Sequence, residues 1–179
     1  MRHLPNILSF LRLVLVGVFV WLFLKGRYLP ALSAFLFAFF TDILDGELAR
    51  RNGWIYDLGK LLDPLADKIM TLAALICIYI GKREGVYLAL FIVMLVKELL
   101  MLIGGLLLAG RQTIVVAAWP GKLATGLFAV GVVLTLISFL PAQVEPWNKL
   151  ILCAAAALSC YALVYYAVTQ GRALFQRRA

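Results

Sequence analysis

The sequence predicts an all-α membrane protein with six transmembrane helices in a single domain, residues 1–179. Composition is the first reason: 64% of the residues are hydrophobic and 15% are charged, whereas soluble domains carry roughly 45–50% and about 25%. The second reason is that the apolar residues fall into six runs, each near the length of about 20 residues that a helix needs to cross a bilayer. A soluble globular domain and a disordered chain are both excluded.

The first three apolar runs are residues 7–24, 28–44 and 61–80. Gly26 separates the first run from the second and favours a turn at that point. The stretch 48–60 is polar and contains Gly53 and Gly59. We therefore expect this stretch to form the turn that sets the second and third helices antiparallel.

The last three apolar runs are residues 86–109, 123–140 and 147–169. The connections before them hold residues that end helices: Gly81, Gly85, Pro120, Gly121, Pro141 and Pro146. The three cysteines lie inside apolar runs without metal-ligand spacing, so a disulfide scaffold and a zinc site are not expected.

Basic residues outnumber acidic ones by 17 to 9, which gives a net charge of +8. They are scattered between the apolar runs, so nucleic acid is not an expected partner, and anionic membrane lipids account for the excess. With both termini inside, ten Lys and Arg residues lie on that side and five on the other. This asymmetry predicts a multi-pass protein of the cell (inner) membrane with cytoplasmic termini.

Six of the nine acidic residues fall between positions 42 and 67: Asp42, Asp45, Glu47, Asp57, Asp63 and Asp67. Four of these interrupt apolar helix, where an ionised Asp costs roughly 2.5–3.5 kcal/mol on insertion scales. One interpretation is that they are solvated charges at helix ends in the headgroup region. The other is that the four carboxylates form one site in which the cost of burying their charges is offset jointly.

The spacing of the acids favours the shared site. Asp42 and Asp45 are i,i+3 and share one helix face, and Asp63 and Asp67 are i,i+4 and share a face of the next helix. Carboxylates that face one another at short distance require cations between them. Oxygen ligands without nearby His or Cys favour Mg²⁺ or Mn²⁺, and two such ions about 3.5–4 Å apart suit displacement at phosphorus.

Small residues accompany the acids. Gly46, Ala49 and Gly59 would let a nucleotide or diphosphate approach the backbone, and Arg50 would contact phosphate oxygens. Close helix packing is an alternative explanation for the small residues.

At this point the pattern resembles a known family. Asp42-x-x-Asp45-Gly46-x-x-Ala49-Arg50, eight residues, and then Gly59-x-x-x-Asp63-x-x-x-Asp67 match every position of the CDP-alcohol phosphotransferase signature. The resemblance implies six transmembrane helices, a homodimer, and a divalent-metal site at the cytoplasmic membrane surface. It also implies the reaction, in which an alcohol hydroxyl attacks the β-phosphorus of a CDP-alcohol and CMP leaves.

The resemblance also implies roles for the motif residues. Asp42, Asp45, Asp63 and Asp67 would bind the metal, and Asp67 would also be the catalytic general base toward the acceptor hydroxyl. The CDP moiety would contact Asp42, Asp45, Gly46, Ala49, Arg50 and Gly59.

Near the start of the chain, Asn6, Ser9 and Arg12 resemble the Asn-x-x-Ser/Thr-x-x-Arg segment of phospholipid-making members. The resemblance places them at nucleotide or lipid phosphate. A helix cap is the alternative role of Asn6.

Within the family, the segments 5–12 and 63–68 resemble bacterial phosphatidylglycerophosphate synthases. This implies CDP-diacylglycerol as donor and sn-glycerol 3-phosphate as acceptor, with Lys97 and Lys122 as acceptor-binding residues. A Lys97–Glu98 pair that satisfies intramembrane charge is the alternative. Because adjacent helix residues point in different directions, we expect each of the two to find another partner.

One departure favours a second acceptor. The synthases carry another Arg about two turns after Arg-Glu, where this chain has Leu102-Ile103-Gly104-Gly105. The Gly-Gly stretch resembles CMP-forming cardiolipin synthases, whose acceptor is phosphatidylglycerol. A transporter with an intramembrane cation site is a remote alternative, because it gives no reason for the Gly, Ala and Arg positions.

Overall fold

The computed structural model describes residues 4–52, 57–109, 119–140 and 144–176. Within them it describes the side chains of residues 10–41, 66, 68–104, 119, 121, 123–140 and 144–169. Six helices account for almost all of these residues, and the described part of the chain contains no strand. In chain order the helices are α1 (Leu4–Leu24), α2 (Tyr28–Asn52), α3 (Asp57–Lys82), α4 (Gly85–Ala109), α5 (Trp119–Ile137) and α6 (Trp147–Gln176).

A helix covers all or most of each of the six apolar runs, but the turn between the second and third differs from the expected one. α2 continues to Asn52 and α3 begins at Asp57, so the connection lies within residues 53–56 rather than 48–60, and Gly59 is helical. Leu48, Ala49, Arg50 and Arg51 are good helix formers. Their backbone therefore continues the helix although the charged side chains of Arg50 and Arg51 do not continue the apolar run.

The turn between α1 and α2 is built as expected. Gly26 has a φ of +70°, a left-handed conformation that glycine adopts without steric cost. Its backbone N–H donates to the Phe23 carbonyl, and the Arg27 N–H donates to the Leu22 carbonyl. These bonds satisfy the last carbonyls of α1 before the chain reverses.

Two stretches within the described residues are long and apolar enough to cross a membrane, Gly85–Gly104 of α4 and Trp147–Thr169 of α6. The apolar parts of α1, α2 and α5 are shorter. Large apolar side chains on the outside of α4 and α6 are exposed, among them Ile92, Val96, Leu99, Ile103, Leu150, Tyr161 and Val164. Lipid is the environment in which such exposed surface is stable.

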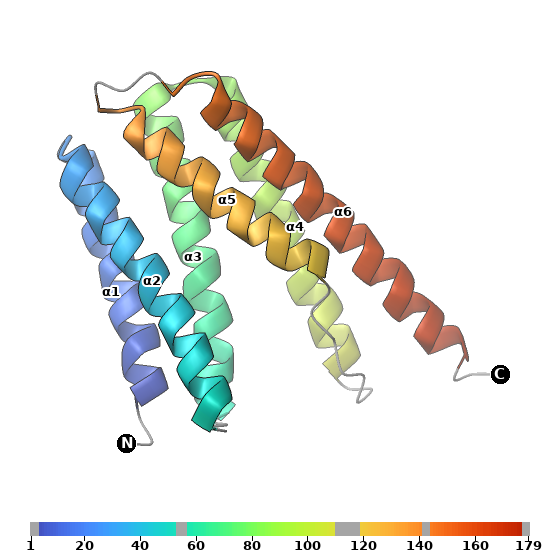
Figure 1. The fold of residues 1–179 in the computed structure, drawn as a ribbon. Coiled ribbons are helices and arrows are strands. Elements are labelled where there is room, and N and C mark those ends of the chain that lie inside the picture. The colour runs from blue at the N-terminus through green and yellow to red at the C-terminus, as the bar shows by residue number, and fades with distance from the viewer. Residues whose placement is uncertain (1–3, 53–56, 110–118, 141–143, 177–179) are drawn as a thin grey trace. The chain divides into compact units, whose positions relative to one another are not determined.

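The chain divides into two compact units. Unit 1 is Met1–Tyr87 with Leu136–Gln143, and unit 2 is Leu88–Thr135 with Val144–Ala179. Unit 1 therefore holds α1, α2 and α3, and unit 2 holds nearly all of α4, α5 and α6 (Figure 1).

In unit 1, α1 packs against both α2 and α3. Aromatic rings fix one end of this packing: the ring centroids of Phe23 and Tyr28 are 5.3 Å apart, and Phe139 stacks on Tyr28 at 4.7 Å. Lys82 Nζ lies 5.2 Å from the centroid of the Phe139 ring. A Cβ on Gly81 would lie 2.6 Å from that ring, so only glycine permits the rings to pack here.

In unit 2, α5 and α6 approach closely at Gly131. A Cβ there would lie 2.8 Å from Cγ and Cδ2 of Leu152 and 3.2 Å from its backbone nitrogen. One turn further along, Thr135 and Asn148 are both fully buried, and the Thr135 hydroxyl donates to the Gly131 carbonyl at 2.7 Å. The missing side chain at Gly131 thus sets the distance between the two helices.

We expect Gly131→Ala to lower the thermal unfolding midpoint in detergent. Overpacking of this kind costs about 1–3 kcal/mol and outweighs the gain of at most about 1 kcal/mol from replacing a helical glycine. Gly126→Ala is the matched control, because a Cβ at that position of the same helix meets nothing within 4 Å. The control should raise the midpoint slightly, and an equal rise for Gly131→Ala would contradict the packing argument.

Candidate active site

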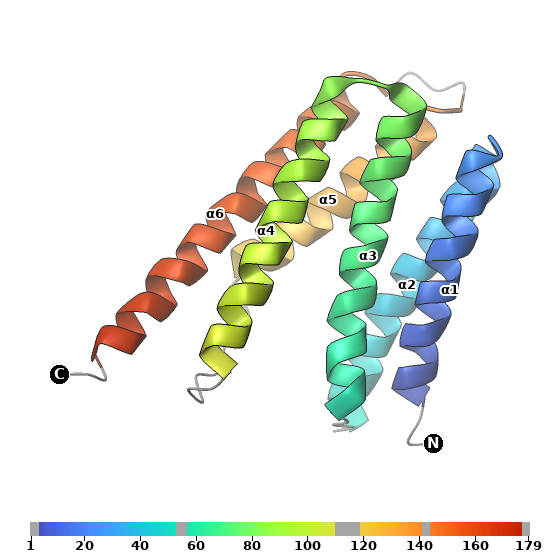
Figure 2. The same cartoon turned by 180° about the vertical axis from the view of Figure 1, so that it is seen from behind.

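The backbone brings the two halves of the aspartate motif to one end of unit 1. Asp42 and Asp45 lie in the second half of α2, and Asp63 and Asp67 lie in the first half of α3. Only residues 53–56 separate the two helices, and the end of α2 lies beside the start of α3 in both Figure 1 and Figure 2. The start of α1 is at the same end.

The side chains of the four aspartates lie outside the described residues, but their helical register is clear. On α2, Ala31, Phe35 and Ala38 are buried, and continuing this alternation of four and three residues leads to Asp42 and Asp45. Phe37 and Phe40 occupy the exposed face of the same helix. The positions of the first aspartate pair are therefore in line with the face of α2 that is buried at Ala31, Phe35 and Ala38.

The register of α3 gives the same result. Met70, Ala74 and Ile78 are buried, and Asp63 and Asp67 precede them on the same face by steps of three or four residues. Ala66, between the two aspartates, is also fully buried, whereas Ile69 is exposed. The helical register thus puts all four aspartate positions in line with faces that are buried further along α2 and α3.

Arg12 of α1 is the largest fully buried side chain among the described residues, with 0% exposure. It starts the buried stripe of α1, which continues through Val16, Phe19 and Phe23. This helix packs against α2 and α3, the two helices that carry the aspartates. Arg12 is therefore a buried cation within the same three-helix unit as the aspartates.

Two contacts between helices indicate where Arg12 lies along the helix axes relative to the aspartates. The rings of Phe19 and Phe35 are 5.7 Å apart, and seven residues toward the motif on each helix, about two turns, lead to Arg12 and Asp42. A Cβ on Gly81 would lie 3.1 Å from Phe23 Cζ. Four turns toward the motif from that contact, about 14 residues, lead to Ser9 on α1 and Asp67 on α3.

The remaining motif residues occupy neighbouring positions. Gly46, Ala49 and Arg50 follow the first aspartates on α2, Gly59 lies one turn before Asp63, and Asn6 lies in the first turns of α1. Their side chains, like that of Ser9, lie outside the described residues, so only their helix positions are fixed.

The acceptor candidates belong to unit 2. Lys97 Nζ lies 2.5 Å from Glu98 Oε1, and the two side chains are 13% and 14% exposed. The pair that the sequence analysis gave as the alternative is therefore present in the structure. The flexible lysine stem reaches its neighbour, and in apolar surroundings two opposite charges are most stable when they neutralise each other.

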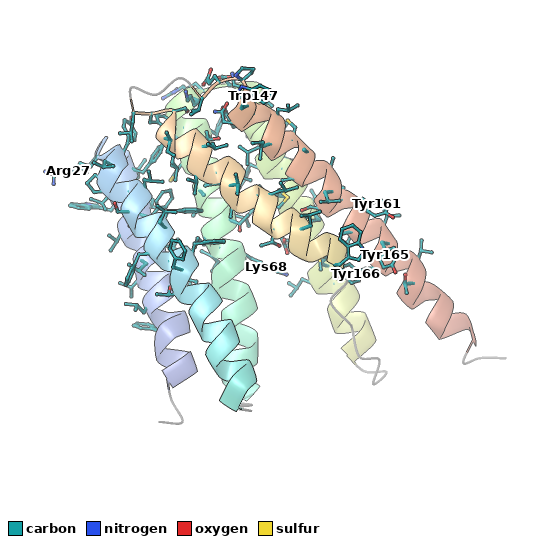
Figure 3. The ribbon with its side chains drawn as sticks, viewed as in Figure 1. Arg27, Lys68, Trp147, Tyr161, Tyr165 and Tyr166 are labelled. Carbon is teal, nitrogen blue, oxygen red and sulfur yellow. The ribbon has the colours of Figure 1, made fainter. Side chains whose placement is uncertain are left out.

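Lys122 lies near the start of α5, and its side chain is outside the described residues. Its neighbour Gly121 would place a Cβ 3.4 Å from Tyr166 Oη. Figure 3 shows Tyr165 and Tyr166 on α6 beside this end of α5. The sequence alone does not mark Tyr166 as a site residue, because spacing along α6 gives no signal of its contact with α5.

The donor set suits a hard divalent cation. The four motif positions supply carboxylate oxygens, which Mg²⁺ and Mn²⁺ prefer, on two helices that meet at one end of unit 1. No His lies in the described part of unit 1, and its cysteine, Cys77, is buried among apolar residues further along α3. The residues therefore fit Mg²⁺ or Mn²⁺ better than zinc.

Comparisons with known proteins identify the family of the chain. A family model described as CDP-alcohol phosphatidyltransferase matches residues 2–165. A CDP-diacylglycerol–glycerol-3-phosphate 3-phosphatidyltransferase of Aquifex aeolicus (strain VF5) is 33% identical over 123 residues, 69% of each chain. The enzyme of the same name from Bacillus subtilis (strain 168) is 29% identical over 192 aligned positions, 99% of this chain and 95% of the relative.

A third relative carries a different name. The CMP-forming cardiolipin synthase of Streptomyces coelicolor is 39% identical over 106 residues, 56% of this chain and 48% of the relative. The family match itself covers the six-helix region from α1 into α6, including all the aspartates placed above. The chain therefore belongs to the CDP-alcohol phosphatidyltransferase family of membrane enzymes that synthesise phospholipids.

Proposed function

We propose that this enzyme transfers a phosphatidyl group from CDP-diacylglycerol to sn-glycerol 3-phosphate, forming phosphatidylglycerophosphate and releasing CMP. The observation that supports the proposal is the helical register of Asp42, Asp45, Asp63 and Asp67, which lie at one end of unit 1 in line with faces that are buried further along α2 and α3. The names of the Aquifex and Bacillus relatives support the same donor and acceptor.

In the proposed mechanism the aspartates hold the donor and move one proton. Asp42, Asp45, Asp63 and Asp67 would hold two Mg²⁺ or Mn²⁺ ions, which when bound neutralise the diphosphate and polarise the phosphorus under attack. Asp67 accepts the proton of the acceptor hydroxyl as its oxygen bonds to the β-phosphorus. The bond from that phosphorus to the CMP oxygen breaks, and CMP leaves.

The small and basic motif residues would bind the CDP moiety. Gly46, Ala49 and Gly59 leave room beside the helix backbones, and Arg50 offers a planar fork of donors to phosphate. Helix α1 would contribute Asn6, Ser9 and Arg12, which would face the diphosphate. The estimate that Ser9 and Asp67 lie at the same position along the helix axes supports this arrangement.

The acceptor would bind through Lys97 and Lys122. A glycerol phosphate needs at least one cation for its phosphate, and Lys122 follows the Gly121 position that contacts Tyr166. Lys97 is neutralised by Glu98, and the chain lacks a second basic residue at 102–105. These two facts favour phosphatidylglycerol as the second candidate acceptor, as in the named Streptomyces relative.

The membrane arrangement completes the proposal. We propose one domain of six spans in the cell (inner) membrane, with both termini and the aspartate site cytoplasmic and with a homodimer as the functional form. The exposed apolar faces of α4 and α6 and the ten-to-five excess of basic residues on the proposed inner side support the topology.

Product analysis tests the function. Purified protein in detergent is incubated with CDP-diacylglycerol and either sn-glycerol 3-phosphate or phosphatidylglycerol, and lipid products are identified by mass spectrometry. We expect CMP and phosphatidylglycerophosphate from the first mixture. Formation of cardiolipin in the second mixture, without product in the first, would establish phosphatidylglycerol as the acceptor. Absence of CMP from both mixtures would refute phosphatidyl transfer and favour the alternative of a transporter with a cation site.

We expect Lys122→Ala to raise the KM for the acceptor at least tenfold and to leave the KM for CDP-diacylglycerol within about twofold. A charge-assisted contact to phosphate is worth roughly 1.5–3 kcal/mol, which is about one to two powers of ten in affinity. Lys149→Ala is the matched control, because Lys149 of α6 pairs with Glu145 at 3.5 Å near the surface. The opposite pattern, with only the donor KM raised, would contradict the acceptor assignment.

A further inference from the structure

The buried charge of Arg12 requires an anionic partner. Its side chain is completely removed from solvent, and an ionised group buried without compensation costs several kcal/mol. Seven acidic residues belong to unit 1: Asp42, Asp45, Glu47, Asp57, Asp63, Asp67 and Glu84. Glu84 follows α3 at the end where Phe23 meets Gly81, three turns along α1 from Arg12. Within unit 1, the candidate partners are therefore the acidic residues at the other end.

Helix geometry selects the aspartates of the motif. Arg12 is level with Asp42 by the contact of Phe19 with Phe35, and it lies about one turn from the level of Ser9 and Asp67. Side chains on a helix lean toward its N-terminus, and the N-terminus of α1 is at the motif end of unit 1. The guanidinium therefore extends from the level of Asp42 toward that of Asp67.

We infer that Arg12 is the internal counter-ion of the aspartate site, a positioning residue that holds the carboxylates in place before the metal binds. The inference rests on the proposed metal site and goes beyond it, since the phosphate contact proposed above gives Arg12 no role without substrate. A guanidinium has five N–H donors, so Arg12 can hold a carboxylate and still face the diphosphate. The positive charge of Arg12 also repels the Mg²⁺ or Mn²⁺ ions that bind to the aspartates.

This arrangement predicts opposite effects on the free protein and on metal binding. Without Arg12, the neighbouring carboxylates lose a buried cation, so the metal-free protein becomes less stable. The same loss removes a positive charge from beside the metal, so the metal binds more tightly. A residue that serves only for packing would lower stability equally with and without metal.

The experiment compares Arg12→Met with the wild type in detergent. Thermal unfolding is followed in EDTA and in saturating Mg²⁺, and the Kd for Mn²⁺ is measured by electron paramagnetic resonance. We expect Arg12→Met to show a larger Mg²⁺-induced rise of the midpoint than the wild type, and a Kd for Mn²⁺ lowered by roughly tenfold, a modest effect for charges a few ångströms apart. Arg12→Lys, which keeps the charge, should respond like the wild type.

Val16→Ala is the packing control, because Val16 is buried one turn along the same stripe. It should lower the midpoint by the same amount in EDTA and in Mg²⁺. If Arg12→Met does not fold, Arg12→Gln, which keeps hydrogen-bond donors without charge, takes its place with the same expected shift in Kd.

The outcomes separate the two proposals. A neutral variant that lowers the midpoint equally in both conditions, with an unchanged Kd for Mn²⁺, overturns the counter-ion role and leaves the metal site intact. A wild-type protein that shows no midpoint shift with Mg²⁺ and no Mn²⁺ binding overturns the metal site, and the counter-ion role with it.

Discussion

Replacing Asp67 with Asn is expected to lower the turnover number by roughly 10²–10⁴-fold, the contribution typical of a positioned general base. The amide keeps the shape of the side chain and one oxygen, but it cannot accept the proton of the acceptor hydroxyl. Because three other aspartates would still hold the donor through the metal, CDP-diacylglycerol should bind with nearly unchanged affinity. The measurements are CMP release under single-turnover conditions and the Kd for the donor.

Asp57→Asn is the matched control for this variant. Asp57 is the first residue of the same helix and lies outside the motif, so its loss should leave turnover within about twofold of the wild type. If Asp67→Asn weakens donor binding as strongly as it slows turnover, Asp67 is a metal ligand and the general base lies elsewhere.

Removal of divalent metal is expected to abolish activity altogether. Four carboxylates at one end of unit 1 would repel both each other and the diphosphate of the donor without cations between them. Excess EDTA should therefore reduce CMP release to background, and addition of Mg²⁺ or Mn²⁺ beyond the chelator should restore it. Activity is followed as CMP released per enzyme at fixed donor and acceptor.

EDTA already saturated with Mg²⁺ serves as the control for effects of the chelator on detergent or lipid, and it should leave the rate unchanged. Full activity in excess metal-free EDTA would contradict the proposed metal site. Restoration by Zn²⁺ alone would contradict the choice of a hard cation.

The positions of the helices could be read from the sequence to within a few residues where the helices are apolar. α4 and α6 begin within one residue of the starts of their apolar runs, 86–109 and 147–169, because hydropathy follows burial in lipid. The boundaries of α2 and α3 were missed by several residues. There the side chains turn polar while the backbone hydrogen bonds continue, and hydropathy does not register backbone continuity.

The aspartate motif could likewise be found from spacing alone. Residues three or four apart share a helix face whatever the tertiary structure, so Asp42 with Asp45 and Asp63 with Asp67 formed pairs before any fold was known. For Lys97 and Glu98 the sequence left a mutual pair and separate partners both open, and the structure shows the pair, because its formation depends on how a flexible side chain bends in its surroundings.

The sequence by itself thus determined the helical class, the order of the six elements and the family, because hydropathy, glycine and proline positions and motif spacing are local properties of the chain. Only the tertiary structure decided that the aspartate positions continue buried stripes, that Arg12 is enclosed by the same unit, and that α5 and α6 meet at Gly131. These features depend on which faces of distant helices come together. That choice is made by packing complementarity and by the cost of burying charge, and neither acts between neighbours in sequence.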